Sequence, residues 1–461
     1  MHLIDYIIIA AYLAVQMGIG IVKRIRHDSS AADLIIGGRM LTLPSFVASL
    51  VSTYYGGILG VGEYSYRYGL SNWLVLGVPY YVAAALFALF LAKKARQSEL
   101  LTIPDKLATV YDNRVAVAGG AVIFFMAVPA AYILMIGSIF RLLFGWPFWL
   151  GVIAGTLFST VYVYLGGFRA LVRNDLFQFA LMYLGFIVLF VYLAMTYGGF
   201  EFLQERLPQT HLTWHGGKSG WYIASWYVVA LSTLIEPAFF QRCYAARTPS
   251  VAKRGILISI ACWAVFDFLT TSCGLYARAI LPDLPDPVAS YPALALQILP
   301  PGLAGLLAVA MLVTVMSTVD SYSFIAASTF SNDIVRRVTR GAEQKIMWYT
   351  RWGLVISTVL ALVMALFFRS VIDIWYAYGS IATPALLIPV LTSFVGKRKL
   401  TSDWAIVTMV SSGGLSLIWY LSQYWTVSGG HWLGLEPIFP GLIVSLVIFG
   451  LASRRVAPGL P

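Results

Sequence analysis

The sequence has few of the residues that most enzyme and metal sites need. Only 3 of its 461 residues are cysteines and only 5 are histidines. Cys243, Cys262 and Cys273 have apolar neighbours and no metal-ligand spacing, so we expect core thiols rather than a disulfide framework or a catalytic thiol. The histidines fall outside the apolar segments, and no acidic pair with metal-ligand spacing accompanies them. A membrane-embedded transferase is therefore disfavoured, and the chain is not expected to be an enzyme.

Charged residues are scarce as well. They make up 11% of the chain, whereas 59% of it is hydrophobic, and a soluble domain has about 25% charged residues. This composition predicts a polytopic membrane protein. The net charge of +11 could indicate nucleic-acid binding, but the basic residues are spread over short loops and form no single face. We therefore expect no nucleic-acid partner.

The apolar segments predict an all-α protein of about thirteen transmembrane helices in the plasma membrane. The expected spans lie near residues 4–22, 40–65, 69–92, 115–140, 145–167, 175–197, 219–244, 255–280, 302–331, 350–369, 371–395, 403–426 and 437–453. All but six of the 31 basic residues fall in alternate loops; the exceptions are Arg67, Arg141, Arg206, Lys218, Arg278 and Arg369. By the positive-inside rule the richer set is cytoplasmic, so the N-terminus is expected outside and the C-terminus inside.

Two of the expected spans are interrupted. The second contains Gly56 and Gly57 followed by two further glycines, and the seventh contains Glu236–Pro237. Glycine and proline both disfavour continuous helix. Interrupted spans in corresponding positions of two halves indicate an inverted-repeat transporter. We expect a single transmembrane domain over 1–461, with repeats at 40–197 and 219–395 and with peripheral helices at 4–22 and 403–453.

The ninth span, Ala308–Asp333, carries hydroxyl groups and a carboxyl group at bilayer depth. On a helix, Thr314, Ser317, Thr318 and Ser321 share one face and Asp320 borders it. Neighbouring oxygen ligands suit a small hard cation. Alternatively, the hydroxyl groups bond to carbonyls of their own helix and Asp320 makes a polar contact between helices.

Several short motifs together resemble the sodium:solute symporter family. They are Asp5–Tyr6; Gly37–Gly38–Arg39; the segment with Gly166, Gly167, Ala170, Asp175 and Gln178; Phe240–Gln241–Arg242; and Met316–Ser317–Thr318 with Asp320, Ser321 and Asp333. The resemblance implies a LeuT-type fold of two five-helix inverted repeats. It also implies sodium-coupled symport of a small polar organic solute by alternating access, with Na+ as the coupling ion.

The resemblance further implies which residues bind cations. The main sodium site would take backbone oxygens of Ser52 and Tyr55 and oxygens of Thr314, Ser317 and Thr318. Asp175, Asp320 and Ser321 would form a second cation site or a proton site. Asp320 departs from the family, where serine is expected, and two buried carboxyl groups favour protonation of one. Asp175 could instead be a surface ion pair or helix cap beside Arg173.

The solute is expected between the interrupted spans. Its predicted lining residues are Thr53, Tyr54, Gly56, Gly57, Trp226, Tyr227, Glu236, Tyr376 and Tyr378. An ionised Glu236 facing the cavity would disfavour an anionic solute and favour an amine or a polyol. That expectation fails if Glu236 is protonated or paired with Gln241 or Arg242.

Other readings stay open at this stage. A proton-coupled or uncoupled permease of the same fold would use Asp175 and Asp320 as proton carriers. The expected partners are the solute and the lipid bilayer, with no obligate protein partner evident. The identity of the solute and the number of coupled sodium ions are not predicted.

Overall fold

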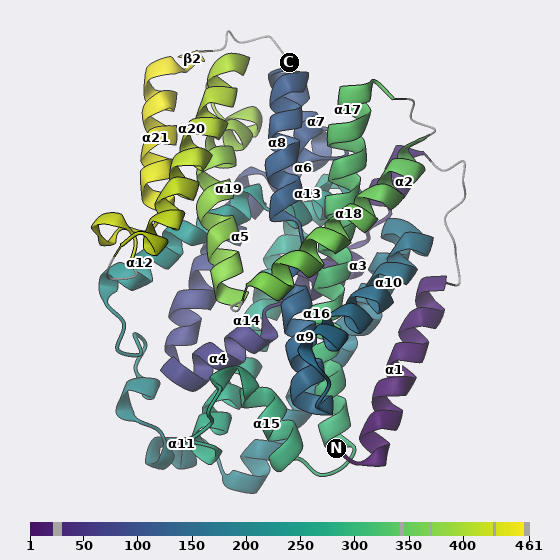
Figure 1. Ribbon diagram of the computed structural model, residues 1–461, viewed down its shortest axis with the longest axis vertical. Helices are drawn as coiled ribbons and strands as arrows, with labels where there is room; N and C mark the ends of the chain where they lie inside the picture. The colour runs from purple at the N-terminus through teal and green to yellow at the C-terminus, as the bar shows by residue number, and fades with distance from the viewer. Residues whose placement is uncertain (22–29, 342–344, 369–370, 427–429, 456–461) are drawn as a thin grey trace.

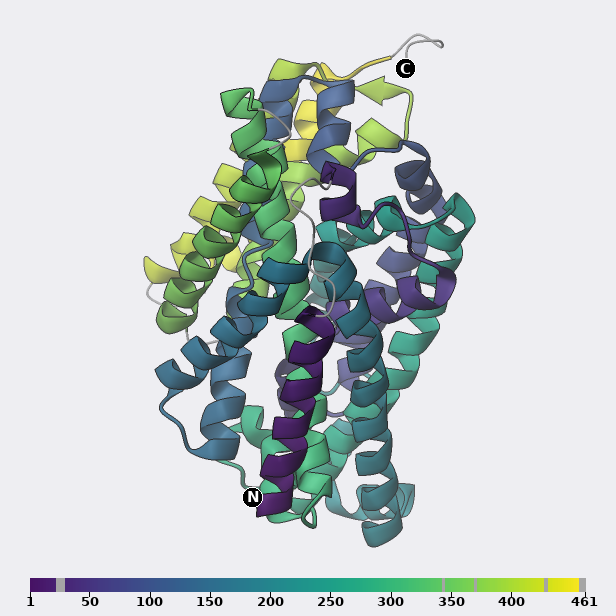
Figure 2. The same ribbon diagram turned by 90° about the vertical axis from the view of Figure 1, so that its right-hand side faces the viewer.

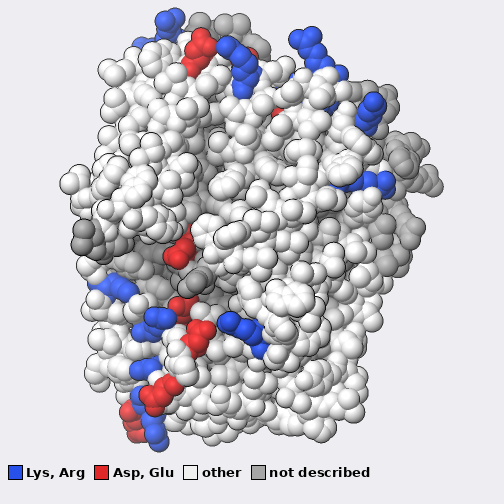
Figure 3. Space-filling view, viewed as in Figure 1, with Lys and Arg blue, Asp and Glu red and all other residues white. Residues whose placement is uncertain are grey.

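The computed structural model describes residues 1–21, 30–341, 345–368, 371–426 and 430–455. They form a bundle of helices, in which α1 begins at one end and α21 finishes near the opposite end (Figures 1 and 2). Two short strands, Arg398–Lys399 (β1) and Arg454–Arg455 (β2), pair antiparallel. On the face shown in Figure 3, much of the middle carries no charged side chain, and Lys and Arg side chains lie along the upper edge.

The first part of the chain forms eleven α-helices before residue 210. They are α1 (Leu3–Ile21), α2 (Ala31–Ile36), α3 (Leu43–Tyr54), α4 (Ile58–Tyr68), α5 (Val78–Phe90), α6 (Ala92–Gln97), α7 (Ile103–Val110), α8 (Asn113–Met126), α9 (Ala130–Phe144), α10 (Phe148–Tyr197) and α11 (Phe200–Arg206).

The second part continues with ten further α-helices. They are α12 (Gly220–Val229), α13 (Pro237–Ala245), α14 (Pro249–Ile280), α15 (Ser290–Gln297), α16 (Leu303–Ser328), α17 (Arg336–Thr339), α18 (Ile346–Phe367), α19 (Val371–Phe394), α20 (Ser402–Leu421) and α21 (Ile438–Ala452).

Nine helices of the described chain are long and apolar enough to cross a membrane, or ten if the bent pair α3 and α4 is one span. Three shorter apolar helices lie at Leu3–Ile19, Phe148–Val161 and Ile438–Ala452. The number of thirteen spans and the orientation of the termini stay predictions. Arg369, one of the six basic residues set apart above, lies outside the described residues.

The predicted interruption of the second span is confirmed. Helices α3 and α4 meet at an angle of 61° across a short break, which contains Gly56 and Gly57. A Cβ atom on Gly56 would lie 2.4 Å from the hydroxyl oxygen and 2.6 Å from the Cβ of Thr318 on α16. Glycine is therefore required here, because it lets the backbone of the break approach α16 closely.

The predicted interruption of the seventh span is confirmed too. Helix α12 passes into a 3-10 segment, Ala230–Ile235, and Glu236 is extended with φ −67° and ψ 114°. Pro237 then begins α13, where its missing N–H costs nothing. The Glu236 carboxylate accepts from the backbone N–H of Ala238 and so caps α13.

The fifth and sixth expected spans are not separated by a loop, as the sequence had indicated, but follow each other in one long helical element. They form α10, whose 50 residues contain one non-helical position, Gly167, with φ 57° and ψ −159°. We expected a cytoplasmic loop between them, but helix resumes directly after Gly167. Consequently Asp175 lies inside a helix and not at the surface, with 1% of its area exposed.

Helix α16 is at the centre of the bundle. Every residue from 307 to 328 is buried, and α16 packs against α1, α9, α10 and α18. Its polar stripe therefore has no contact with lipid and must find partners among the neighbouring helices.

Candidate functional site

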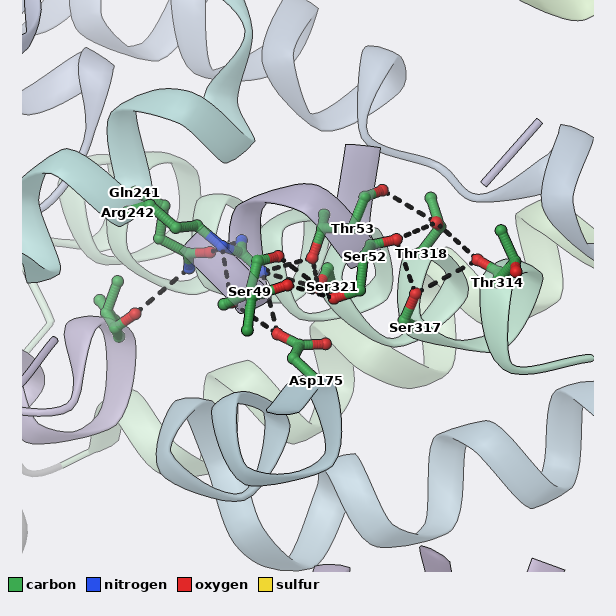
Figure 4. A network of polar contacts seen from close by, with 12 residues as sticks. Ser49, Ser52, Thr53, Asp175, Gln241, Arg242, Thr314, Ser317, Thr318 and Ser321 are labelled. Carbon is green, nitrogen blue, oxygen red and sulfur yellow. Dashed lines mark hydrogen bonds and ion pairs between the residues drawn. The ribbon is translucent and has the colours of Figure 1, made fainter. Parts of the chain in front are cut away.

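The C-terminal end of α3 meets the polar stripe of α16 in a group that we name the hydroxyl cluster: Ser52, Thr53, Thr314, Ser317 and Thr318. The Ser317 hydroxyl donates to the Ser52 carbonyl at 2.8 Å. The Thr318 hydroxyl donates to the Thr53 carbonyl at 2.8 Å (Figure 4). All five residues are fully buried. The cluster thus brings uncharged oxygens of two helices together.

Each of these two hydroxyl groups has a second acceptor. Ser317 Oγ and Thr318 Oγ1 both lie 3.2 Å from the Thr314 carbonyl of their own helix. A hydroxyl that donates to this carbonyl frees its lone pairs and also frees the carbonyl of α3. The same atoms can therefore either bond to one another or face a cation. Four or five neutral oxygens of this kind suit a small hard cation.

The sequence predicted backbone oxygens of Ser52 and Tyr55 in the sodium site, and the structure adds Thr53 to the residues of α3 that contact α16. Ser52 takes part through its carbonyl, because its side chain donates to Ala48 O at 2.8 Å within α3. Thr53, which we predicted to line the solute site, supplies the second carbonyl. Tyr55 turns its hydroxyl away, to Asp267 and Thr270 of α14. The place of the Tyr55 carbonyl in a sodium site stays a prediction.

A second polar group, which we name the arginine cluster, lies beside the first: Ser49, Thr53, Asp175, Gln241, Arg242 and Ser321. Arg242 of α13 is fully buried and donates to Thr53 Oγ1 at 2.7 Å and to Ser321 Oγ at 2.8 Å. It also donates to Ser49 Oγ and Gln241 Oε1. Its Nη2 atom lies 3.6 Å from Asp175 Oδ2. A guanidinium group thus occupies the middle of this cluster (Figure 4).

The arginine cluster corrects two expectations. We counted Arg242 among the basic loop residues, which is wrong, because it is buried inside the bundle. The reading of Asp175 as a surface ion pair is also wrong, because its carboxylate accepts from Ser49 at 2.6 Å in the interior.

Only part of the predicted second cation site comes together. Asp175 and Ser321 both reach the arginine cluster. Asp320 is buried but faces elsewhere, near Ser159 of α10. No hydrogen bond or ion pair joins Asp320 to the other two among the described residues. One step along a helix turns a side chain by about 100°, which explains why neighbours 320 and 321 face different helices.

A cavity of about 200 Å³ lies between the two helix breaks. It is lined mainly by aromatic side chains: Tyr54, Tyr55, Tyr80, Tyr81, Tyr132, Trp226, Trp263, Tyr322, Trp375, Tyr376 and Tyr378. Among its other lining residues are Gly57, Ser232, Glu236, Asp267 and Gly379. Of the nine residues predicted to line a solute site, six line this cavity, and Thr53, Gly56 and Tyr227 do not.

Two carboxyl groups face this cavity. Glu236 Oε1 accepts from the Tyr322 hydroxyl at 2.9 Å and from the Ala238 N–H at 3.3 Å. Asp267 accepts from the hydroxyl groups of Tyr55 and Tyr81, one on each oxygen. Both carboxyl groups therefore act as acceptors. No Lys, Arg or His is among the lining residues found in the described chain.

Several lining residues were missed from the sequence, most of them on helices that contributed no predicted lining residue. Tyr80 and Tyr81 lie on α5, Trp263 and Asp267 on α14, and Trp375 on α19. Asp267 alone gave a signal, as the one acidic residue in its apolar segment. Aromatic residues in a membrane bundle are more often packing than lining, so the others could not be singled out.

The sequence of the chain is similar to those of known membrane transporters. The model of the "Sodium:solute symporter family" matches residues 34–411. The sodium/pantothenate symporter of Escherichia coli K12 is 26% identical over 478 residues, which cover 98% of this chain and 96% of that protein. The sodium/proline symporter of Staphylococcus aureus JH9 is 22% identical over 485 residues, covering 97% and 92%.

Solved structures agree in fold. A Na+-coupled sialic acid symporter has a TM-score of 0.81 at 16% identity, over 99% of this chain and 100% of that one. MhsT in complex with L-phenylalanine has a TM-score of 0.52 at 15% identity, over 89% and 98%. The likeness shows the predicted LeuT-type fold. These proteins are multi-pass membrane transporters and not enzymes, as the sequence predicted for this chain.

Proposed function

Because the chain belongs to the sodium:solute symporter family, we propose that it is a sodium-coupled symporter that carries a small polar organic solute into the cell by alternating access. The hydroxyl cluster is the observation that supports this most directly. It joins the broken helix α3 to the central helix α16 through uncharged oxygens that have two alternative bonding patterns. An ion bound there would tie the two helices together.

The cluster also suggests how sodium and solute are coupled. Tyr54 at the end of α3 and Gly57 in the break after it both line the cavity. Ser52 and Thr53 near the end of α3 contribute carbonyls to the hydroxyl cluster. An ion that holds the end of α3 against α16 therefore also fixes part of the cavity wall. Coupling of this kind is reciprocal, so sodium and solute should tighten each other's binding by the same factor.

We propose that one sodium ion is transported per cycle. Two of the three residues predicted for a second cation or proton site, Asp175 and Ser321, already contact the guanidinium group of Arg242. The third, Asp320, faces elsewhere. A fixed positive charge at this position satisfies the carboxylate and opposes the entry of a second cation. This proposal replaces the second cation site predicted from the sequence.

The two interrupted elements support inverted repeats at 40–197 and 219–395. The break between α3 and α4 and the break between α12 and α13 lie at corresponding positions of the two proposed repeats. Both breaks contribute residues to one cavity. This arrangement is typical of transporters that bind their solute at the interface of two repeats.

The test is the thermal stability of the detergent-purified protein in sodium chloride and in potassium chloride. An ion that binds the folded state stabilises it by about 2.7 kcal/mol at a hundred times its Kd. We expect a sodium-specific increase in Tm that disappears in the Ser317→Ala/Thr318→Ala double variant.

A matched control is Ser328→Ala. Its hydroxyl also belongs to α16 but donates to the Ile325 carbonyl of the same helix, so the sodium effect should persist. If saturating sodium leaves the Tm of the unmodified protein unchanged, the proposal fails and a proton-coupled or uncoupled permease becomes the better reading.

A further inference from the structure

The cavity between the helix breaks has an unbalanced charge. Glu236 and Asp267 are its two ionisable acids, and none of its lining residues in the described chain is basic. Glu236 is 7% exposed and Asp267 is 6% exposed, so both are almost cut off from bulk water. Carboxylates at such depth are costly unless a positive charge or several donors compensate for them.

The hydrogen bonds around these acids favour their ionised forms. Glu236 accepts from the first turn of α13, where the helix dipole stabilises a negative charge. The Tyr322 hydroxyl donates to the same oxygen. Asp267 accepts from two tyrosine hydroxyl groups, one at each oxygen. A carboxylate that only accepts hydrogen bonds is stabilised as an anion.

Neither of these two acids forms an ion pair with a basic side chain of the described residues. Arg242 is the buried basic side chain closest in sequence to Glu236, and its ion pair is with Asp175. The expectation of an amine fails if Glu236 is protonated or if it pairs with Gln241 or Arg242. No hydrogen bond or ion pair joins Glu236 to Gln241 or Arg242 among the described residues, and the hydrogen bonds to its carboxylate favour the ionised form.

The cavity wall is also suited to a cation. The rings of Tyr132 and Tyr322 lie 5.4 Å apart, and those of Tyr132 and Trp375 lie 5.9 Å apart. The rings of Tyr54 and Trp263, which also line the cavity, lie 5.1 Å apart. Aromatic faces attract ammonium groups, and more strongly where water is excluded. The buried Tyr376 hydroxyl has no hydrogen-bond partner among the described residues and is available to a solute.

We infer that this cavity binds a solute that carries an ammonium group, held by the Glu236 carboxylate and surrounded by the aromatic wall. The transport of this solute with sodium rests on the function proposed above, whereas its binding does not. Tyr322 keeps Glu236 oriented, and Asp267 of α14 adds a second carboxyl group to the cavity lining. An anion such as a carboxylic acid meets two like charges here and no basic side chain.

The test compares three probes that share one skeleton. They are the cation 2-phenylethylammonium, the neutral alcohol 2-phenylethanol and the anion 3-phenylpropanoate. Each is titrated against the purified full-length protein in sodium chloride while Tm is measured. We expect the ammonium probe to raise Tm with an apparent Kd at least tenfold lower than that of the alcohol, and the carboxylate to bind most weakly.

Two variants assign the preference to a residue. Glu236→Gln keeps the shape of the side chain and an oxygen for Tyr322, and should lower the preference for the ammonium probe at least tenfold. Glu63→Gln is the matched control, because Glu63 on α4 pairs with Arg67 and does not line the cavity; it should leave the preference unchanged.

The outcomes separate this inference from the proposed function. The inference is overturned if the carboxylate probe binds as tightly as the ammonium probe, if none of the probes raises Tm, or if Glu236→Gln retains the preference. The sodium effect on Tm without any probe tests the sodium site alone. An ammonium preference without a sodium effect would refute sodium-coupled symport and support the inferred solute class. A sodium effect without an ammonium preference would support sodium binding and refute the inferred solute class.

Discussion

The hydroxyl cluster and the arginine cluster share the helices α3 and α16, and the arginine cluster also takes residues from α10 and α13. The two clusters differ in where their positive charge comes from. The first contains only neutral oxygens, with hydroxyl groups that choose between two acceptors. The second is filled by a guanidinium group that is covalently part of the protein. A site of the first kind can take up and release an ion, whereas the second keeps its charge throughout. If sodium binds at the hydroxyl cluster as proposed, the position of Arg242 leaves one of the two clusters to an exchangeable ion and fills the other.

Removal of the fixed charge should have the largest effect. Arg242→Gln leaves the Asp175 carboxylate buried without its ion pair, and breaking a buried pair in this way costs about 3–5 kcal/mol. We expect a large fall in Tm, and a clear recovery when Asp175→Asn is added, because the double variant has no unpaired charge. Thermal unfolding of the two single variants and the double variant gives the coupling energy. Strictly additive losses would contradict the pairing.

The Arg242→Gln variant should also make the arginine cluster resemble the hydroxyl cluster, as a group of oxygens without a fixed positive charge. With Arg242→Gln, the carboxylate and hydroxyl oxygens around Asp175 are left without a resident cation. We expect sodium to recover part of the lost stability, and the dependence of Tm on sodium concentration to become steeper than in the unmodified protein. Potassium at equal ionic strength is the control. If the dependence of Tm on sodium concentration is unchanged in the variant, the guanidinium group of Arg242 does not occupy a position that sodium could take.

The second-largest effect is expected from a change at Gly56, where the break between α3 and α4 closely approaches α16. Gly56→Ala puts a methyl group 2.4–2.7 Å from the side-chain atoms of Thr318, and such overpacking typically costs about 1–3 kcal/mol. We expect the hydroxyl cluster to be pushed apart and the sodium-dependent increase in Tm to be lost.

Gly60→Ala is a matched control for this change. Its added methyl group would lie 3.5 Å from the Trp375 ring, which is ordinary contact. It should retain the sodium effect, so similar behaviour of the two variants would argue against a special role of the break.

The smallest effects should separate two serines that are one turn apart on α16. Ser317→Ala removes an oxygen from the hydroxyl cluster, and Ser321→Ala removes one from the arginine cluster. Each loses hydrogen bonds worth about 1 kcal/mol. We expect Ser317→Ala to raise the apparent Kd for sodium at least tenfold and Ser321→Ala to change it less than twofold. Sodium titrations of Tm give both values, and equal shifts would mean that the clusters do not act separately.

The sequence predicted those parts of the site that depend on local chemistry. Glycines at 56 and 57 and the Glu236–Pro237 pair disfavour helix wherever they occur, so both breaks were found. The polar face of α16 follows from helical periodicity, and Ser317 and Thr318 do meet the end of α3.

The remaining parts depend on packing between distant segments. Arg242 follows an apolar stretch and looks like a loop residue. Its burial depends on partners that are distant in sequence, Asp175 on α10 and acceptors on α3 and α16. Asp320 borders the polar stripe on a helical wheel, yet the neighbouring helices decide that it faces α10 near Ser159. The cavity collects aromatic rings from helices that are separated by more than 200 residues, and no local pattern records that arrangement.

Thr53 belongs to both clusters, because its carbonyl accepts from Thr318 while its hydroxyl contacts Arg242 and Ser321. The carbonyl carbon and the Cβ atom that carry these two oxygens are both bonded to the Cα atom of Thr53, so a backbone movement at this residue displaces both oxygens. The consequence is kinetic. Departure of an ion from the hydroxyl cluster and reorganisation around the guanidinium group should occur together, as a single relaxation with one rate constant and not as two successive steps.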